Sequence, residues 1–319
     1  MAVSIVIVSY NTRDATLECI SSVLESPPND ATIVVVDNGS TDDSAAAIRE
    51  RYPSVVVDEA RANLGFAAGV NRGVRRTAGE YVLLLNPDTV VRPGSLASLM
   101  AFAENNPHYG LYGGRTVHRD GSLEPSSCWG APSLWSLTCF ALGLSTIFKR
   151  SRLFDPESLG SWARDTVREV PIITGCLLLM RRAHWDALGG MDETYFLYGE
   201  DADFSIRATR QGHCPVIVPQ AVVIHDVGGS SAWHGAKMSM VMAGKTTLLK
   251  RSWTPGRARI GIALIAAGTL LRATAERALG RRGTWWTVWR RRRDWSEGYP
   301  RARSTLFGLP VEQGRGGGA

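Results

Sequence analysis

Carboxylates follow two apolar runs of this chain, at the point where each run ends. Asp37 closes the run 31–36, and Asp88 follows the run 81–85, after a proline that cannot donate to a strand ladder. Because such runs predict buried strands, we expect both acids at the carboxyl edge of one sheet, where open α/β sheets bind ligands. There they could bind a nucleoside and hold a divalent cation with its phosphates. The alternatives are an Asx turn at Asp37 and a helix cap at Asp88.

Two further segments carry weaker signals. Residues 63–71, Asn-Leu-Gly-Phe-Ala-Ala-Gly-Val-Asn, form a glycine-bearing loop that enters a helix and could expose N–H groups to phosphate. This loop is neither a P-loop nor a G-x-G-x-x-G motif. His225 follows a short predicted strand, and its residue type alone favours a turn histidine over a metal ligand.

Three acids begin a predicted helix further along the chain: Glu200, Asp201 and Asp203. Acids favour helix starts, and Asp203 can pair with Arg207 four residues later, so a structural role is a strong alternative. The preceding aromatic segment 195–198 is typical of a surface that binds a sugar or a lipid head. We expect the helix dipole to keep Asp201 ionised near neutral pH, as a general base requires.

Strand and helix patterns alternate through the first part of the chain. The sequence predicts strands at 3–9, 31–36, 54–57 and 81–85, and helices at 15–24, 44–51 and 69–77. Ser40 is the expected cap of the second helix, with an acid three residues later. This rhythm predicts an α/β fold with a doubly wound, mostly parallel sheet. The first segment has no basic n-region, so we expect a first strand and no signal peptide.

The pattern changes after Asp88. We expect a helix at 95–105, a strand pair at 109–123 that turns at Asp120-Gly121, and an irregular acceptor-side region or lid at 125–170. The later predicted elements are a strand at 172–180, helices at 183–188, 201–211 and 233–251, and short strands at 216–218 and 222–224.

Composition narrows the class of protein. An apolar fraction of 44% and a charged fraction of 21% are those of a globular protein. The five cysteines are widely spread and form no C-x-x-C pair, which argues against a disulfide framework or a zinc site and favours a reducing compartment.

Charge is distributed unevenly along the chain. Residues 250–319 hold 15 Lys/Arg and 4 Asp/Glu, a net +11, so with a total of +6 the residues 1–249 carry −5. The apolar stretch 260–271 is too short to span a bilayer. Arginine and tryptophan interleave over 281–293, which favours an anionic membrane surface. One alternative for the tail is a basic helix that packs on the rest of the protein through its tryptophans. The other is nucleic-acid binding, and the acidic charge of residues 1–249 argues against it. The end, Gly314–Ala319, is expected to be disordered.

Six segments occur in an order that outweighs each one alone. They are Val8–Thr12, Val36–Asp42, Asn63–Phe66, Asn86–Thr89, Gly189–Glu193 and Tyr198–Asp203. In this combination the chain resembles family 2 glycosyltransferases over about residues 3–230, and most of all bacterial rhamnosyltransferases that act on lipid-linked acceptors. The tail lies outside the resemblance.

The resemblance implies a GT-A fold, an inverting mechanism and a nucleotide-sugar donor, with dTDP-L-rhamnose favoured. By position, the nucleotide would be bound by Ser9, Tyr10, Asn11, Asp37, Asn63, Gly65, Asn71 and Asn86. Asp88 and His225 would hold Mg²⁺ or Mn²⁺, and Asp201 would be the general base with Glu200 beside it. The chain departs from the family's D-x-D element, because Asn86 replaces the first acid and brings no charge.

We therefore expect a cytoplasmic enzyme, peripheral at the inner face of the plasma membrane, that takes part in cell-envelope polysaccharide synthesis. The expected parts are a nucleotide-sugar half at 1–124, an acceptor and catalytic half at 125–250, and the basic helical tail at 251–319. Three alternatives stay open: a UDP-sugar or deoxyaminosugar donor, a non-catalytic nucleotide-binding scaffold at the membrane, and a nucleotidyltransferase, whose basic glycine-rich loop is not seen here. The acceptor, which is a glycan or a polyprenyl-linked sugar, its linkage position and a homodimer stay undecided.

Overall fold

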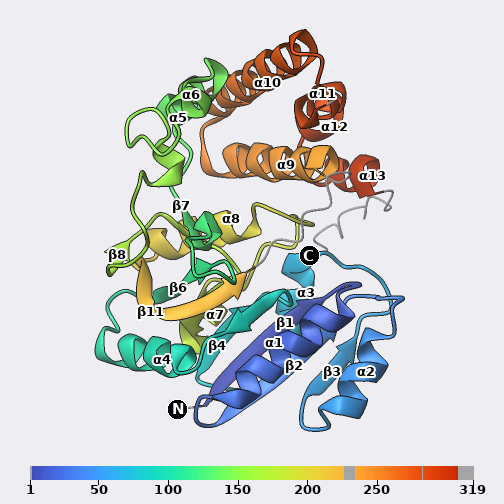
Figure 1. Ribbon diagram of the computed structural model, residues 1–319, viewed down its shortest axis with the longest axis vertical. Helices are drawn as coiled ribbons and strands as arrows, with labels where there is room; N and C mark the ends of the chain where they lie inside the picture. Colours follow the sequence, from blue (N-terminus) through green and yellow to red (C-terminus); the bar gives the residue numbers. More distant parts are fainter. Residues whose placement is uncertain (1, 226–233, 282, 308–319) are drawn as a thin grey trace, which may run out of the picture. The chain divides into compact units, whose positions relative to one another are not determined.

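A computed structural model describes residues 2–225, 234–281 and 283–307 of the chain. These residues form two compact units (Figure 1). Of the described residues, unit 1 holds 2–131, Arg150–Glu193 and 201–225, and unit 2 holds Pro132–Lys149, Thr194–Glu200, 234–281 and 283–307. The expected disordered end, Gly314–Ala319, and the first residue of the helix predicted from Trp233 lie outside the described residues.

The first half of unit 1 is a parallel sheet. Its strands are β1 (Val3–Ser9), β2 (Ala31–Asp37), β3 (Val56–Glu59) and β4 (Tyr81–Leu85), in the spatial order β3-β2-β1-β4. Buried β-branched residues fill β1 and β2, as strands covered on both faces require. The sheet is doubly wound, as predicted from the alternating pattern.

Helices cover both faces of this sheet. The helices are α1 (Arg13–Glu25), α2 (Ser44–Arg51), α3 (Phe66–Val74), α4 (Ser95–Asn105), α7 (Arg182–Ala187) and α8 (Glu200–Arg210). Apolar residues of α1, α2 and α4 pack with one set of alternate strand residues, and those of α3 and α8 pack with the other. Figure 1 shows α1 lying across the face of the strands.

The second half of the sheet is mixed. β10 (Leu177–Arg181) lies antiparallel between β4 and β6 (Leu111–Val117), and β11 (Pro215–His225) runs parallel to β6. The short strands β5 (Thr89–Val91) and β8 (Arg168–Glu169) pair antiparallel with β11. β7 (Cys128–Trp129) and β9 (Ile172–Ile173) form a separate pair, and two 3₁₀ turns cover Pro125–Ser127 and Pro156–Ser158.

Several predicted elements were wrong in detail. The two strands at 216–218 and 222–224 are one strand, β11, whose register against β6 shifts between Ile217 and Val222. The strand at 172–180 is divided into β9 and β10, and the second strand of the pair at 109–123 is a single bridge, Val117 to Leu123. These deviations are local irregularities of pairing that a period-2 pattern cannot resolve.

The predicted Ser40 cap was also wrong. Asp43, in the left-handed region, precedes α2, and the N–H of Ser44 donates to Asp42 Oδ1 at 3.2 Å. The Ser40 hydroxyl instead accepts from the N–H of Asn11 at 3.0 Å. It therefore joins the loops that follow β1 and β2.

Unit 2 is helical and has its own apolar core. Its helices are α5 (Leu134–Ala141), α6 (Leu144–Ile147), α9 (His234–Ser252), α10 (Pro255–Ala278), α11 (Thr284–Arg290), α12 (Arg292–Trp295) and α13 (Arg301–Phe307). The region predicted to be irregular thus contains α5, whose start is a capping box between Ser133 and Ser136.

The apolar stretch 260–271 belongs to a longer helix than predicted. α10 has 24 residues, which by length and composition alone is enough to cross a membrane; core helices of soluble proteins meet the same criterion. The expectation that this part of the chain is too short to span was therefore wrong, because the helix continues beyond the apolar run at both ends.

Candidate active site

The parallel strands bring the predicted site residues to one edge. Ser9 at the end of β1 is paired with Asp37 at the end of β2, and Ile7 of β1 is paired with Leu85, the last residue of β4. The loops after β1, β2 and β4 therefore begin side by side at the carboxyl end of the sheet. This is the edge at which open α/β sheets bind ligands.

Asp37 is buried and only partly satisfied. Its side chain is 4% exposed, and its Oδ1 has no hydrogen-bond partner among the described residues. The next residue, Asn38, fixes the glycine-bearing loop: its Nδ2 donates to Asn63 Oδ1 and to the Gly65 carbonyl, both at 3.1 Å. Asp37, Asn63 and Gly65 are thus brought together, with a carboxylate oxygen left for a ligand.

The turn after β1 uses its three predicted residues differently. Ser9 is buried and its hydroxyl lies 2.9 Å from Thr16 Oγ1, so its side chain supports α1. Tyr10 is 47% exposed. Asn11 accepts from the N–H of Thr41 at 2.8 Å and so fixes this turn to the loop after β2.

Asn71 does not join this group. Its Nδ2 donates to the Met191 carbonyl at 2.8 Å and to Glu193 Oε1 at 2.9 Å, while its Oδ1 accepts from the Met191 N–H at 2.9 Å. The side chain is therefore engaged in holding the segment Gly189–Glu193, one of the six segments singled out in the sequence.

Asp88 and His225 converge at the end of β4. Thr89 and His225 are paired residues of β5 and β11, and this register brings Asp88 Oδ1 to 3.4 Å from His225 Nε2. On the other side of the ring, His225 Nδ1 lies 3.3 Å from Glu124 Oε2 and 3.2 Å from Ser126 Oγ. The imidazole thus lies between two carboxylates.

These neighbours determine the charge of the site. Burial alone would lower the pKa of His225, but hydrogen bonds with Asp88, Cys176 and Glu124 raise it to about 12. Burial tends to raise the pKa of Glu124, yet its hydrogen bonds with His225 and Ser126 hold it below its ordinary value. The side chains therefore form a compact carboxylate–imidazole–carboxylate group.

The donor set fits a hard divalent cation that also has other ligands. Asp88 offers one carboxylate oxygen, and His225 Nε2, which faces it, would become a ligand once a cation displaces the proton that the raised pKa keeps on the ring. The Asp88 side chain is 38% exposed, so it is open to a ligand. Among the residues that the structure describes, no three His, Cys, Asp or Glu converge as a metal cage. Mg²⁺ commonly binds in this way, through one or two protein ligands, substrate phosphates and water.

Asn86 lies beside this group. Its Nδ2 donates to Cys176 Sγ at 3.4 Å, and its carbonyl accepts from the Thr89 hydroxyl at 2.7 Å. The amide therefore packs where the family's first acid would stand, and it adds no charge to the pair Asp88 and His225.

Asp201, the second residue of α8, has an enclosed carboxylate. Its Oδ2 accepts from the Gly175 N–H at 3.0 Å, and its buried Oδ1 has no partner within the described parts of the chain. Burial raises its pKa from 3.8 to about 6, while the bond from Gly175 opposes the shift. Burial therefore outweighs the stabilisation by the helix dipole that we expected, and the carboxylate stays mostly ionised at neutral pH.

The two neighbouring acids have different surroundings. Glu200, the first residue of α8, is buried. Asp203 accepts from Arg207 Nε at 2.7 Å, as the i, i+4 spacing predicts. The same guanidinium also donates to the carbonyls of Leu188 and Gly190. Asp203 is thus a structural residue.

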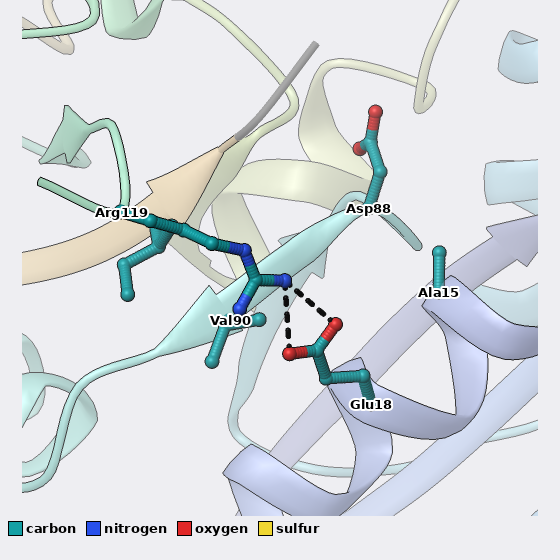
Figure 2. A pocket seen from close by; sticks show the side chains of 6 residues that line it. Ala15, Glu18, Asp88, Val90 and Arg119 are labelled. Atoms are coloured by element: carbon teal, nitrogen blue, oxygen red, sulfur yellow. Dashed lines mark hydrogen bonds and ion pairs between the residues drawn. The ribbon is translucent and has the colours of Figure 1, made fainter. Parts of the chain in front are cut away.

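A pocket opens beside Asp88, lined also by Ala15, Glu18, Val90, Arg119 and Ile224. Figure 2 shows Arg119 reaching across to Glu18, with distances of 2.9 and 3.0 Å from Arg119 Nη2 to the two carboxylate oxygens. Asp88 and Ala15 lie beyond this ion pair. The guanidinium next to Asp88 is therefore paired with the Glu18 carboxylate.

Sequence reasoning missed Glu124, Cys176 and Arg119. Arg119 lies shortly after β6, Cys176 directly before β10, and Glu124 directly before the 3₁₀ turn at Pro125–Ser127, all in segments without a motif. The pairing of Val117 with Ile224 in the parallel strands β6 and β11 is what brings Glu124 to His225. Only the order of the strands in the sheet, which a pattern of apolar residues does not give, could have revealed this neighbour.

The sheet, its ligand-binding edge and the acids along it define a glycosyltransferase of the GT-A fold. The chain belongs to glycosyl transferase family 2, whose sequence profile matches residues 4–184. It is 32% identical over 240 residues to N-acetylglucosaminyl-diphospho-decaprenol L-rhamnosyltransferase of Mycobacterium tuberculosis. This alignment covers 69% of this chain and 75% of the mycobacterial protein.

Solved structures agree with the fold. A mannosyltransferase from Pyrobaculum calidifontis, in complex with GDP-Man and Mn²⁺, superposes with a TM-score of 0.55 at 19% identity. The superposition covers 97% of this chain and 88% of the mannosyltransferase chain. GalNAc-T7 with UDP, GalNAc and Mn²⁺ gives a TM-score of 0.60 at 15% identity, covering 94% and 58%. The predicted family and fold are thereby confirmed.

Proposed function

We propose that this glycosyltransferase moves L-rhamnose from dTDP-L-rhamnose to a hydroxyl of a glycan or polyprenyl-linked acceptor, with inversion at the anomeric carbon. The mycobacterial relative, which is named for rhamnosyl transfer to a lipid-linked N-acetylglucosamine, supports this choice of donor and acceptor. The observation that carries the chemistry is the Asp201 carboxylate, with one oxygen fixed by Gly175 and the other without a partner.

Asp201 acts as the general base. Its Oδ1 removes the proton from the acceptor hydroxyl while that oxygen attacks the anomeric carbon from the face opposite the nucleotide. The bond from the anomeric carbon to the diphosphate oxygen breaks, and its electron pair leaves with dTDP. A base whose pKa is about 6 suits this step, because it is ionised at neutral pH and still accepts a proton. Glu200, the preceding buried residue, is the second carboxylate that we assign to the catalytic group.

Asp88 and His225 hold the divalent cation, Mg²⁺ or Mn²⁺. When bound, the cation neutralises the charge that develops on the leaving diphosphate. Glu124 is a positioning residue: its contact with Nδ1 fixes the ring so that Nε2 faces Asp88. The Mn²⁺ in two structural neighbours supports a divalent metal.

The nucleotide lies along the ends of β1 and β2 in this proposal. Asp37 Oδ1 accepts from an N–H or O–H of the nucleoside, and Tyr10 offers its exposed ring to the base. In the loop at 63–65 the N–H groups of Leu64 and Gly65 donate to Asn38 Oδ1 and Asn63 Oδ1, both at 3.0 Å, so Asn63 and Gly65 shape the nucleotide site and do not offer these groups to the phosphates. Asn86 contacts the ribose. Ser9, Asn11 and Asn71 act through other residues, because their side chains are bonded within the protein.

The enzyme works at the inner face of the plasma membrane, where a polyprenyl-linked acceptor is embedded. The basic tail supports a peripheral association with anionic lipid, since residues 250–319 hold 15 Lys/Arg and 4 Asp/Glu.

Direct transfer tests the proposal. Purified protein is incubated with dTDP-L-rhamnose, Mn²⁺ and a short-chain prenyl-diphosphate N-acetylglucosamine, and the product is identified by mass and by the anomeric configuration of the new bond. We expect a single rhamnose to be added, with inversion. Transfer from a UDP-sugar under the same conditions, with none from dTDP-rhamnose, would overturn the donor. Retention of configuration would overturn the assignment of Asp201.

A further inference from the structure

Exposed apolar side chains are concentrated on two segments of unit 2. Eight of the thirteen large apolar residues that are exposed in the described part of the chain lie between Pro132 and Lys149 or on α10 and the residue after it. These eight are Trp135, Leu142, Ile147, Phe148, Ile260, Leu270, Leu271 and Leu279. Single exposed apolar residues need no explanation, but a group of this size marks an interaction surface.

The exposed residues of α10 form one stripe. Ile260, Ala263, Ala267, Leu270 and Thr274 are all exposed and recur at intervals of three and four, so they follow one side of the helix. The opposite side is packed within unit 2. A Cβ at Gly261 would come within 3.1 Å of atoms from α5, α9 and Trp253, and one at Gly268 within 2.8 Å of Phe140 of α5.

The α5–α6 segment extends this stripe sideways. Arg272 of α10 donates to the Phe140 carbonyl at 2.6 Å and to Thr146 Oγ1 at 2.7 Å, and a Cβ at Gly143 would lie 3.3 Å from Leu271. Figure 1 shows α5 and α6 beside one end of α10. Leu142 and Ile147, which are 62% and 71% exposed, are therefore held next to the exposed stripe.

Basic residues border this apolar surface. Arg257, Arg259, Arg277 and Arg281 are exposed at the two ends of α10, and Lys149 is exposed at the end of the α5–α6 segment. The single acid of α10, Glu276, accepts from the N–H groups of Trp285 and Trp286, at 2.9 and 3.2 Å. Residues 132–149 contain no acid. An apolar stripe with arginines at its ends complements the interface of an anionic membrane.

The tryptophans of the tail pack within unit 2, which is the alternative that the sequence left beside a membrane surface. Trp285, Trp286 and Trp289 are partly buried and Trp295 is fully buried. Arg272, Arg277 and Arg292 stack on three of these rings within unit 2. The alternating Arg-Trp pattern therefore builds the helical core of unit 2.

We propose that the exposed face of α10 and the α5–α6 segment, centred on Leu142, Ile147, Ile260 and Leu270, docks onto an anionic membrane with α10 lying in the plane of the interface. This docking surface rests on the proposed function, because it brings the enzyme to a lipid-linked acceptor. An in-plane helix fits better than a spanning one. The inner side of α10 is packed against protein, and Arg272, in the last third of the helix, is bonded to the α5–α6 segment.

Vesicle sedimentation of the full chain tests the docking surface without donor or acceptor. We expect the protein to bind vesicles of phosphatidylglycerol and phosphatidylcholine at least about tenfold more tightly than phosphatidylcholine alone. Ile147→Asp and Ile260→Asp should each weaken this binding by about tenfold or more. Each variant replaces a large apolar side chain, which would be buried in the lipid, by a carboxylate. Val56→Asp is the matched control: Val56 is also exposed, on the edge strand of unit 1, and its variant should bind like the wild type.

Four results would overturn the docking surface. The first two are no binding to either vesicle and unchanged binding of both variants. The third is membrane-bound protein that resists extraction with alkaline carbonate, as a spanning helix would. The fourth is a pair of variants that convert a dimer to a monomer without affecting vesicle binding. The variants should transfer sugar to a water-soluble acceptor at the wild-type rate, because both changes lie outside the active site. A protein that binds vesicles but transfers no sugar would refute the proposed function and leave the docking surface intact.

Discussion

The Asp201 carboxylate combines a fixed oxygen with an unpartnered one, and burial holds its pKa at about 6. Replacing it by Asn keeps the size and the bond from Gly175 but removes the base. We expect Asp201→Asn to bind dTDP with Mn²⁺ like the wild type and to lose turnover by about 10²-fold or more. Calorimetry and initial rates measure the two effects; retained turnover would refute the base.

The same pKa predicts how activity depends on pH. The base must be ionised to accept a proton, so kcat/KM should fall about tenfold per pH unit below pH 6. The stability effect has the opposite direction. Because the folded pKa lies above the ordinary 3.8, the native state loses stability as pH rises from about 4 to about 6. Asp201→Asn should therefore unfold at no lower temperature than the wild type at pH 7. An activity profile that is flat down to pH 4.5 would contradict the assignment.

Glu124 acts on the metal site through His225. Its Oε2 lies 3.3 Å from His225 Nδ1, and the Glu124 side chain is 8% exposed. Glu124→Gln removes the charge that orients the ring, so we expect Mn²⁺-dependent binding of dTDP to weaken by about tenfold or more, with metal-free binding unchanged. Glu59→Gln, which removes a surface partner of Arg49, is the control. Equal loss of binding with and without Mn²⁺ would show a general disturbance of the fold instead.

At the scale of elements, α3 fixes a distant segment through one side chain. Asn71 makes three hydrogen bonds to Met191 and Glu193. Asn71→Ala leaves the Met191 N–H and carbonyl without these partners, so we expect a loss of about 1–3 kcal/mol in the free energy of unfolding. Urea denaturation measures it. Asn105→Ala, which removes an exposed bond to the Ala101 carbonyl, should cost less than about 0.5 kcal/mol. Equal costs for the two variants would contradict the positioning role of Asn71.

The approach of α10 to α5 is tightest at Gly268. A Cβ at Gly268 would meet Phe140 Cδ1 at 2.4 Å and the Phe140 carbonyl at 2.8 Å, whereas one at Gly256 meets nothing within 4 Å. We expect Gly268→Ala to lower the free energy of unfolding by about 1–3 kcal/mol. Gly256→Ala should raise it by up to about 1 kcal/mol, because alanine favours the helix. If both changes stabilise the protein, the two helices are not packed as described.

For the whole molecule, features that depend on neighbouring residues in the sequence could be predicted, and features that depend on contacts between distant segments could not. The parallel half of the sheet was predictable because each buried strand is one apolar run and each connecting helix has a local pattern. The pair Asp88 and His225 was predicted only from the family resemblance, since 137 positions in the sequence separate two residues that the β5–β11 register joins. The contact of Glu124 was not predictable, and the packing of the tail tryptophans could be named only as an alternative, because both depend on which elements pair.

Donor choice also belongs to the whole molecule, because a ligand that binds only the folded chain raises its stability. At a hundredfold excess over Kd the gain is about 2.7 kcal/mol, and a tenfold difference in affinity between two nucleotides is about 1.4 kcal/mol. We expect thermal unfolding to be shifted most by dTDP with Mn²⁺, less by UDP and least by GDP. The shift for dTDP should shrink without the metal, since Asp88 and His225 then contribute no bridge to the diphosphate. Asp88→Ala is the control that should abolish the effect of Mn²⁺ while leaving the metal-free shift intact. A larger shift with GDP than with dTDP would overturn the rhamnose donor, and a metal effect that persists in Asp88→Ala would overturn the proposed ligand.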